Sequence, residues 1–135
     1  MGKINHTSQS IDVGIVTYNP DKMLDFYSNT LGLIREAEIP FPNLGVVNKF
    51  VFGDGYLKIL VLESEPQNQN IIGNFTVMNG IRYITINLSN IEEIISECKK
   101  NNIVIVNEPI EIRPKVTVAV IQDPDGNLIE MMQSN

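Results

Sequence analysis

The feature that most constrains the fold is an internal repeat, because the order strand, helix and three strands occurs twice. The first copy occupies residues 10–63, the second residues 80–133, and a connection of residues 64–79 separates them. A repeat of this kind indicates two copies of one structural unit. In each unit one helix would cover one face of a sheet and leave the other face open. We therefore predict a single α+β domain, residues 1–135, of two βαβββ modules that form a curved mixed sheet with a central cleft.

In the first copy, residues 11–17 alternate in polarity and predict a strand. The segment Asn19-Pro20-Asp21 suits a helix start, with Asn19 as cap, proline in the first turn and a carboxylate at the positive end. Apolar residues then recur at helical spacing until Gly32, which is expected to end the helix. Three further strands are predicted at residues 33–39, 45–52 and 56–63.

The second copy repeats this order. Residues 82–88 predict a strand, and Ser89 and Glu92 are spaced as a capping box at the start of the next helix. Ile91, Ile94, Ile95 and Cys98 form the apolar stripe of that helix. Strands are predicted at residues 103–107, 115–122 and 127–133. Between the two copies, residues 64–74 are rich in Asn, Gln, Pro and Glu, which predicts a mobile surface connection.

Composition excludes several classes of function. The chain has 135 residues, of which 43% are hydrophobic, and it carries a net charge of −6. No basic stripe is present to neutralise phosphates, so we expect no nucleic-acid partner. No apolar run approaches the ~20 residues of a membrane helix, and residues 1–10 lack the apolar centre of a secretory signal. These features predict a cytoplasmic protein without a membrane partner.

Few residues could act as nucleophiles. Cys98 is the one cysteine and falls on the apolar face of a predicted helix, where a buried structural thiol is expected. The one histidine, His6, belongs to the polar N-terminal tail. The sequence contains no glycine-rich phosphate loop, nucleophile elbow or Cys/His cluster.

Several segments of the two copies resemble the vicinal-oxygen-chelate superfamily, which includes glyoxalases, bleomycin-resistance proteins and extradiol dioxygenases. These segments are Asp12-Val13-Gly14-Ile15-Val16, Asp25-Phe26-Tyr27, Thr30-Leu31-Gly32-Leu33, Gly80-Ile81-Arg82-Tyr83-Ile84 and Asp123-Pro124-Asp125-Gly126-Asn127-Leu128-Ile129-Glu130. The resemblance covers about residues 10–133. It implies the two-module fold, a cleft that holds a small organic ligand, and a homodimer in which two chains can complete each cleft.

Enzymes of that superfamily hold a divalent metal ion with four side chains from four strands. The resemblance places Asp12 and Tyr83 where the first and third ligands, usually histidines, would stand, and Glu130 at the fourth. Asp12 and Tyr83 are 71 residues apart, and the position 71 residues before Glu130 is Ile59, which would be the second ligand. A slip of one residue would place Lys58 or Leu60 there instead. A catalytic metal site needs about three protein ligands. No cofactor or metal site is expected from this set.

Alternatives stay open for each of these residues. Asp12 is a solvent-exposed carboxylate at a strand end or part of the cleft. Tyr83 packs in the core or contacts a ligand. Glu130 shares a strand face with Leu128 and Met132, and we place it in the cleft on the resemblance. Its charge partner would come from a set of four basic residues: Lys58, Arg82, Arg113 and Lys115.

Three functions follow as hypotheses. The first is a non-catalytic protein that binds a small organic molecule, sequestering a drug or metabolite, with Asp12, Ile59, Tyr83, Glu130 and Arg113 around the ligand. The second is a glyoxalase-like lyase, isomerase or dioxygenase that uses Glu130 as general base or metal ligand. The third is a protein–protein module whose cleft is filled by its own side chains.

Overall fold

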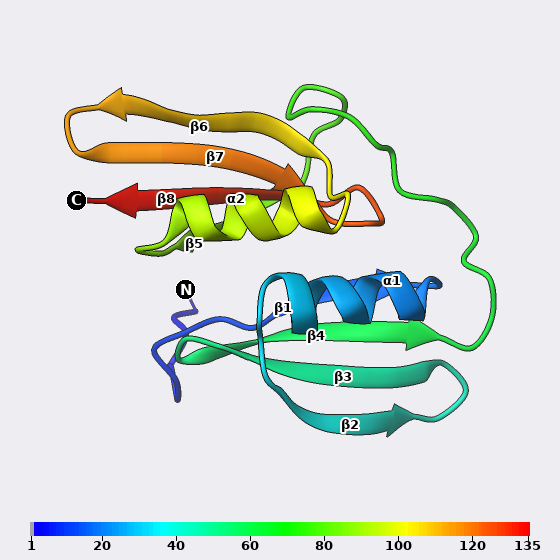
Figure 1. Cartoon of the computed structure of the whole chain (residues 1–135). Coiled ribbons are helices and arrows are strands. Elements are labelled where there is room, and N and C mark those ends of the chain that lie inside the picture. Colours follow the sequence, from blue (N-terminus) through cyan, green and yellow to red (C-terminus); the bar gives the residue numbers. More distant parts are fainter. Residues whose placement is uncertain (1) are drawn as a thin grey trace.

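The computed structural model describes residues 2–135; Met1, the first residue of the predicted tail, lies outside them. Eight strands form two four-stranded mixed sheets (Figure 1). Sheet A has the strand order β1-β4-β3-β2 and sheet B the order β5-β8-β7-β6. Sheet A comprises β1 (Val13–Thr17), β2 (Arg35–Phe41), β3 (Gly45–Phe52) and β4 (Gly55–Leu62), and sheet B comprises β5 (Tyr83–Asn87), β6 (Ile105–Arg113), β7 (Val116–Gln122) and β8 (Leu128–Ser134).

The two sheets repeat one topology, which confirms the α+β class and the two βαβββ modules. In each module the first strand pairs in parallel with the last, and the other strands pair antiparallel. The predicted curved mixed sheet consists of two four-stranded halves. In the part of the chain that the structure describes, no strand ladder joins β1 to β5.

One helical segment covers each sheet. The first begins as α1 (Pro20–Asp25) and continues as a wider turn, η1 (Phe26–Thr30), and the second is α2 (Ile91–Lys100). The predicted capping box at α2 is wrong. Asn90 is the cap residue, without a side-chain cap bond, and the backbone N–H of Ile91 donates instead to Oε1 of Gln133 on β8. A tertiary contact therefore replaces the local cap.

The core lies between the helices and the faces of the sheets that they cover. Its buried members are Met23, Phe26, Tyr27, Phe50, Leu57, Ile59, Ile91, Ile95, Cys98, Ala119, Ile121, Ile129 and Met131. Strand alternation explains the set, because Leu57 and Ile59 on β4 and Ile129 and Met131 on β8 point to the same helix-covered side. Both modules contribute to one continuous cluster of buried side chains.

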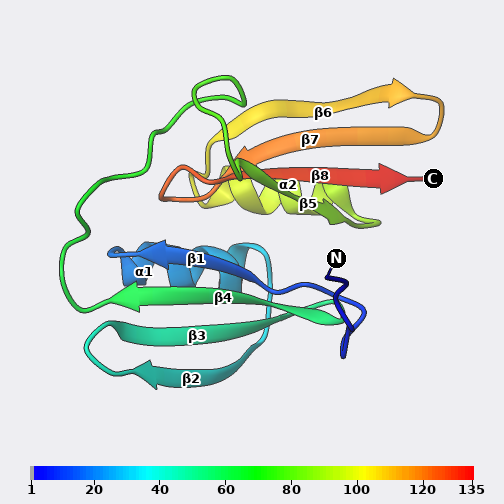
Figure 2. The ribbon, with the colours of Figure 1, turned by 180° about the vertical axis from the view of Figure 1, so that it is seen from behind.

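Hydrogen bonds also join the modules. The Tyr27 hydroxyl donates to Asp123 Oδ2 over 2.6 Å, and the Asn101 amide donates to Thr30 Oγ1 over 3.1 Å. Both helices lie on the same side of the molecule, so the other side shows the open faces of the two sheets, with β1 and β5 as the neighbouring edges (Figure 2). Residues 63–82, which connect the modules, contain no helix or strand.

Candidate functional site

The open face of sheet A, here called face A, is an apolar surface interrupted by one row of charge. Strand register places Val16, Leu60, Val47 and Ile39 side by side in one row across the sheet. The adjacent row is Gly14, Lys58, Lys49 and Ala37. Ile39 and Val16 remain about half exposed, at 47% and 56%. Exposed aliphatic side chains in such a row are typical of a surface that binds another molecule.

The open face of sheet B, face B, is more covered. Val120 and Leu128 point to this face by alternation, yet they are 3% and 1% exposed. The connection between the modules passes the end of sheet B at which β5 begins and β7 ends (Figure 2). Its Phe75 packs edge-on against Tyr83, with ring centroids 4.9 Å apart. The two modules therefore have similar folds but differently accessible open faces.

Asp12 forms an ion pair at one end of face A. Its Oδ2 lies 3.3 Å from Nζ of Lys58, and its Oδ1 accepts a hydrogen bond from the backbone N–H of Tyr56. Both side chains of the ion pair are about two fifths exposed. The Asp12 carboxylate is thus held against β4 by two partners.

The prediction that Ile59 lines the cleft is wrong. Ile59 is fully buried on the helix side of sheet A, and the alternative with a slip of one residue, Lys58, lies on face A. Lys58 pairs with Gly14 on β1, as Glu130 pairs with Thr85 on β5, so Lys58 is the repeat counterpart of Glu130. The alternation of apolar residues along β4 was the signal that could have placed Lys58 correctly.

Tyr83 and Glu130 both lie on face B. Tyr83 is half exposed, and Glu130 Oε1 accepts a hydrogen bond from Thr85 Oγ1 over 2.9 Å. None of the four basic residues considered as its charge partner forms an ion pair with Glu130 in the described chain. Arg113, also predicted to contact a ligand, is exposed at the far end of β6, opposite Val116. The structure therefore brings Asp12 to Lys58 and leaves Tyr83, Glu130 and Arg113 without side-chain contact to that pair.

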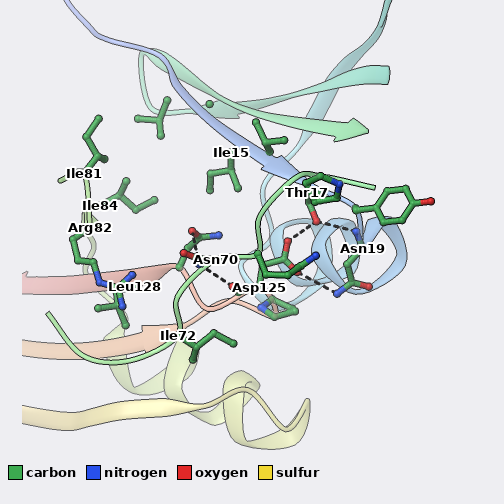
Figure 3. A pocket seen from close by; sticks show the side chains of 18 of the residues that line it. Ile15, Thr17, Asn19, Asn70, Ile72, Ile81, Arg82, Ile84, Asp125 and Leu128 are labelled. Atoms are coloured by element: carbon green, nitrogen blue, oxygen red, sulfur yellow. Dashed lines mark hydrogen bonds between the residues drawn. The ribbon is translucent and has the colours of Figure 1, made fainter. Parts of the chain in front are cut away.

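A groove of about 670 Å³ lies between β1, β5 and the connection. Figure 3 shows Ile15, Ile72, Ile81 and Leu128 along it, with a hydrogen-bonded polar cluster at the end near Thr17 and Asn19. There Thr17 and Asn19 donate hydrogen bonds to the carboxylate of Asp125, and the Asn70 amide donates to the Asp125 carbonyl. Because these polar groups hydrogen-bond to one another, they hold the β7–β8 turn against β1 and against the connection.

The most perturbed ionisable pair lies in the core. Burial raises the pKa of Tyr27 well above 10.0, and the neighbouring Asp123 carboxylate adds to the effect. Burial also raises the pKa of Asp123 above 3.8, although hydrogen bonds from Tyr27 and Asn127 act in the opposite direction. Asp123 accepts three hydrogen bonds from its own turn besides that of Tyr27. A carboxylate so enclosed serves the fold and has no access to a ligand.

The sequence matches the Glyoxalase/Bleomycin resistance protein/Dioxygenase superfamily over residues 3–131. The chain belongs to this family. The match covers both modules and the connection, so it agrees with the resemblance of the two repeat copies. Among curated proteins, nothing matches the chain.

Solved structures show the same fold at low sequence identity. A glyoxalase family protein from Bacillus cereus has a TM-score of 0.83 at 16% identity, over 99% of this chain and 98% of that one. An antibiotic binding protein from Streptomyces has a TM-score of 0.69 at 18% identity, over all of both chains. A glyoxalase I mutant from Zea mays has a TM-score of 0.74 at 16% identity, over 90% of this chain and 43% of that one. An antibiotic binding protein and a glyoxalase I thus have the same fold as this chain.

Proposed function

We propose that this protein binds a small organic molecule against its open sheet faces, sequestering a drug or metabolite, and that it lacks the metal site of its family. The observation that carries the proposal is Lys58. It occupies the repeat counterpart of Glu130, and its ammonium is paired with Asp12, the residue at the first ligand position.

The donor groups do not suit a divalent ion. An ammonium group repels a metal ion and offers it no lone pair. Tyr83 places a phenol where a histidine would stand, and a phenol is not among the usual protein ligands of Zn²⁺. Across residues 2–135, no group of three or more His, Cys, Asp or Glu side chains comes together. Asp12 and Glu130 alone provide fewer ligands than a catalytic metal site requires.

The exposed apolar side chains support a binding role. Face A presents Val16, Ile39 and Phe41, each about half exposed, beside the half-buried Leu60. An organic ligand that covered this row would remove apolar surface from water, at about 25 cal/mol per Å². The fold shared with an antibiotic binding protein from Streptomyces supports this role.

We also propose a homodimer in which a second copy helps to enclose the ligand. Face A exposes Val16, Ile39 and Phe41 to solvent within residues 2–135. A second copy that packed on this face would cover them. No helix of the described chain is long and apolar enough to cross a membrane. A cytoplasmic location stays a prediction from the sequence.

Two measurements on the intact chain test the binding function. Protein purified without chelator should carry far less than one divalent metal ion per chain by elemental analysis. A thermal-shift screen of small organic molecules in the presence of chelator should find ligands that raise the melting temperature in a saturable way. A stoichiometric metal ion, or stabilisation only when metal is added, would contradict the proposal.

A second function, a glyoxalase-like lyase, isomerase or dioxygenase, is favoured by one observation. Glu130 lies on face B with one carboxylate oxygen free of hydrogen bonds from the described residues. It could therefore act as a general base toward a bound substrate. If so, Glu130→Gln would abolish turnover without changing ligand affinity, while Thr85→Val would weaken turnover only modestly. Turnover that is equal in wild type and Glu130→Gln would exclude this role.

A further inference from the structure

Two lysines of face A stand directly opposite each other on neighbouring strands. Lys49 on β3 pairs with Lys58 on β4. Like charges in this position repel each other and destabilise a sheet. The chain as a whole is acidic, with a net charge of −6, so the pair is a local exception.

The surroundings give the two lysines different partners. Lys58 is paired with Asp12, whereas Nζ of Lys49 lies 3.9 Å from the ring centroid of Tyr56. Lys49 makes no ion pair within residues 2–135. A hydrogen bond to Glu36 raises the pKa of Tyr56, so one further carboxylate lies near this group. The two ammonium groups are therefore partly balanced, and Lys49 has no directly bound counter-ion.

The row that holds the lysines has small residues at both ends. Gly14 and Ala37 flank the lysines in that row, so little side-chain volume rises on either side of them. The next row is wholly aliphatic, as described above for Val16, Leu60, Val47 and Ile39. Two neighbouring lysines therefore lie in the row next to an apolar platform.

On these grounds we propose that the ligand of face A is an amphipathic anion, an apolar molecule with a carboxylate, sulfonate or similar group. The anionic group lies between Lys49 and Lys58, and the apolar body covers the aliphatic row. The inference rests on the binding function proposed above and names the chemical class of the ligand. It opposes the simple expectation that an acidic protein selects a cationic ligand. Asp12 competes with the anion for Lys58 and so limits its affinity.

Two matched fluorescent probes test the proposal. Anilinonaphthalene sulfonate carries an anionic group, and phenylnaphthylamine has the same aromatic body without it. The anionic probe should bind the intact chain several-fold more tightly, and added salt should reduce that difference. Lys49→Gln and Lys58→Gln should each lower the affinity for the anionic probe by about five- to tenfold, the range expected for one charged contact. The affinity for the neutral probe should stay unchanged.

Two further variants keep the test specific. Asp12→Asn removes the competing carboxylate and should raise the affinity for the anionic probe several-fold. Damage to the fold would not produce such a gain. Lys22→Gln, which changes the same charge at an exposed position on α1, should affect neither probe. Circular dichroism and melting curves check that each variant is folded.

The outcomes separate the two proposals. Binding of both probes with no effect of the lysine variants overturns the ligand class but leaves the binding function standing. Absence of saturable binding by either probe overturns this inference, and failure of the whole thermal-shift screen overturns the binding function as well. If the lysine variants change only the dimerisation constant, face A belongs to a second copy of the chain and the inference is wrong.

Discussion

Replacing Tyr27 by phenylalanine removes a buried hydrogen bond that links the first helical segment to the β7–β8 turn of the other module. Tyr27 is fully buried, Asp123 is 1% exposed, and the bond between them measures 2.6 Å. The phenyl ring still fills the space, so no cavity forms. A buried hydrogen bond to a charged acceptor contributes about 1.5–3 kcal/mol. For a chain of this length each kcal/mol lowers the melting temperature by roughly 3–4 °C, so the melting temperature of Tyr27→Phe should be about 5–12 °C below that of the wild type.

The assay is urea unfolding and calorimetry of the wild type, Tyr27→Phe and a control, Tyr18→Phe. Tyr18 is half exposed, and its hydroxyl makes no hydrogen bond within residues 2–135. The control should stay within about 0.5 kcal/mol of the wild type, as is usual for a surface change. Because the bond joins the modules, Tyr27→Phe should also broaden the unfolding transition. Equal stability of Tyr27→Phe and Tyr18→Phe would refute the energetic role of this bond.

Three other predictions concern single positions. Ile59→Ala should lose about 2–5 kcal/mol of unfolding free energy by leaving a cavity, whereas Leu60→Ala on face A should lose about 1 kcal/mol and weaken probe binding; the opposite ranking in unfolding experiments would contradict the assigned faces. Cys98 is fully buried, and burial raises the pKa of its thiol to about 11. Its native reaction with a disulfide reagent should therefore be at least about 100-fold slower than in unfolded protein, because both access and the thiolate fraction fall; rapid native labelling would contradict this. Because the pKa of Asp123 is raised in the folded protein, the folded chain keeps a proton that the unfolded chain loses near pH 3.8. The free energy of unfolding should therefore fall as pH rises from 3.8 through the raised pKa. Urea titrations of the wild type and of Asp123→Asn should show this slope only in the wild type.

Most of the fold followed from local patterns. Periodicity and the internal repeat predicted both helices and all eight strands, because an element with one buried face must repeat its apolar residues at a fixed period. The prediction stopped β6 at residue 107, while the strand continues to Arg113. The register shifts along β6 and Pro109 within it interrupt the alternation that marks a regular strand.

The candidate site was harder to predict because it depends on register. The position of the second ligand was obtained by assuming that the chain between the first and the last strand has the same length in both modules. It is one residue shorter in the first module, so the expected position moved from Lys58 to Ile59. Such a slip exchanges the two faces of a strand. The opposition of Lys49 and Lys58, and the bond from Tyr27 to Asp123, join residues from different strands or modules. No local pattern in the sequence contains that information.

Methyl resonances of the intact protein, followed by NMR during a titration with anilinonaphthalene sulfonate in the presence of chelator, test the account most directly. We predict saturable shifts at the methyl groups of Val16, Val47 and Leu60 on face A, with Ile59 and Ile129 behind the sheets unaffected. Shifts confined to the helix-covered methyl groups, or shifts that occur only after chelator is replaced by a divalent metal ion, would contradict a metal-free ligand site on the open face.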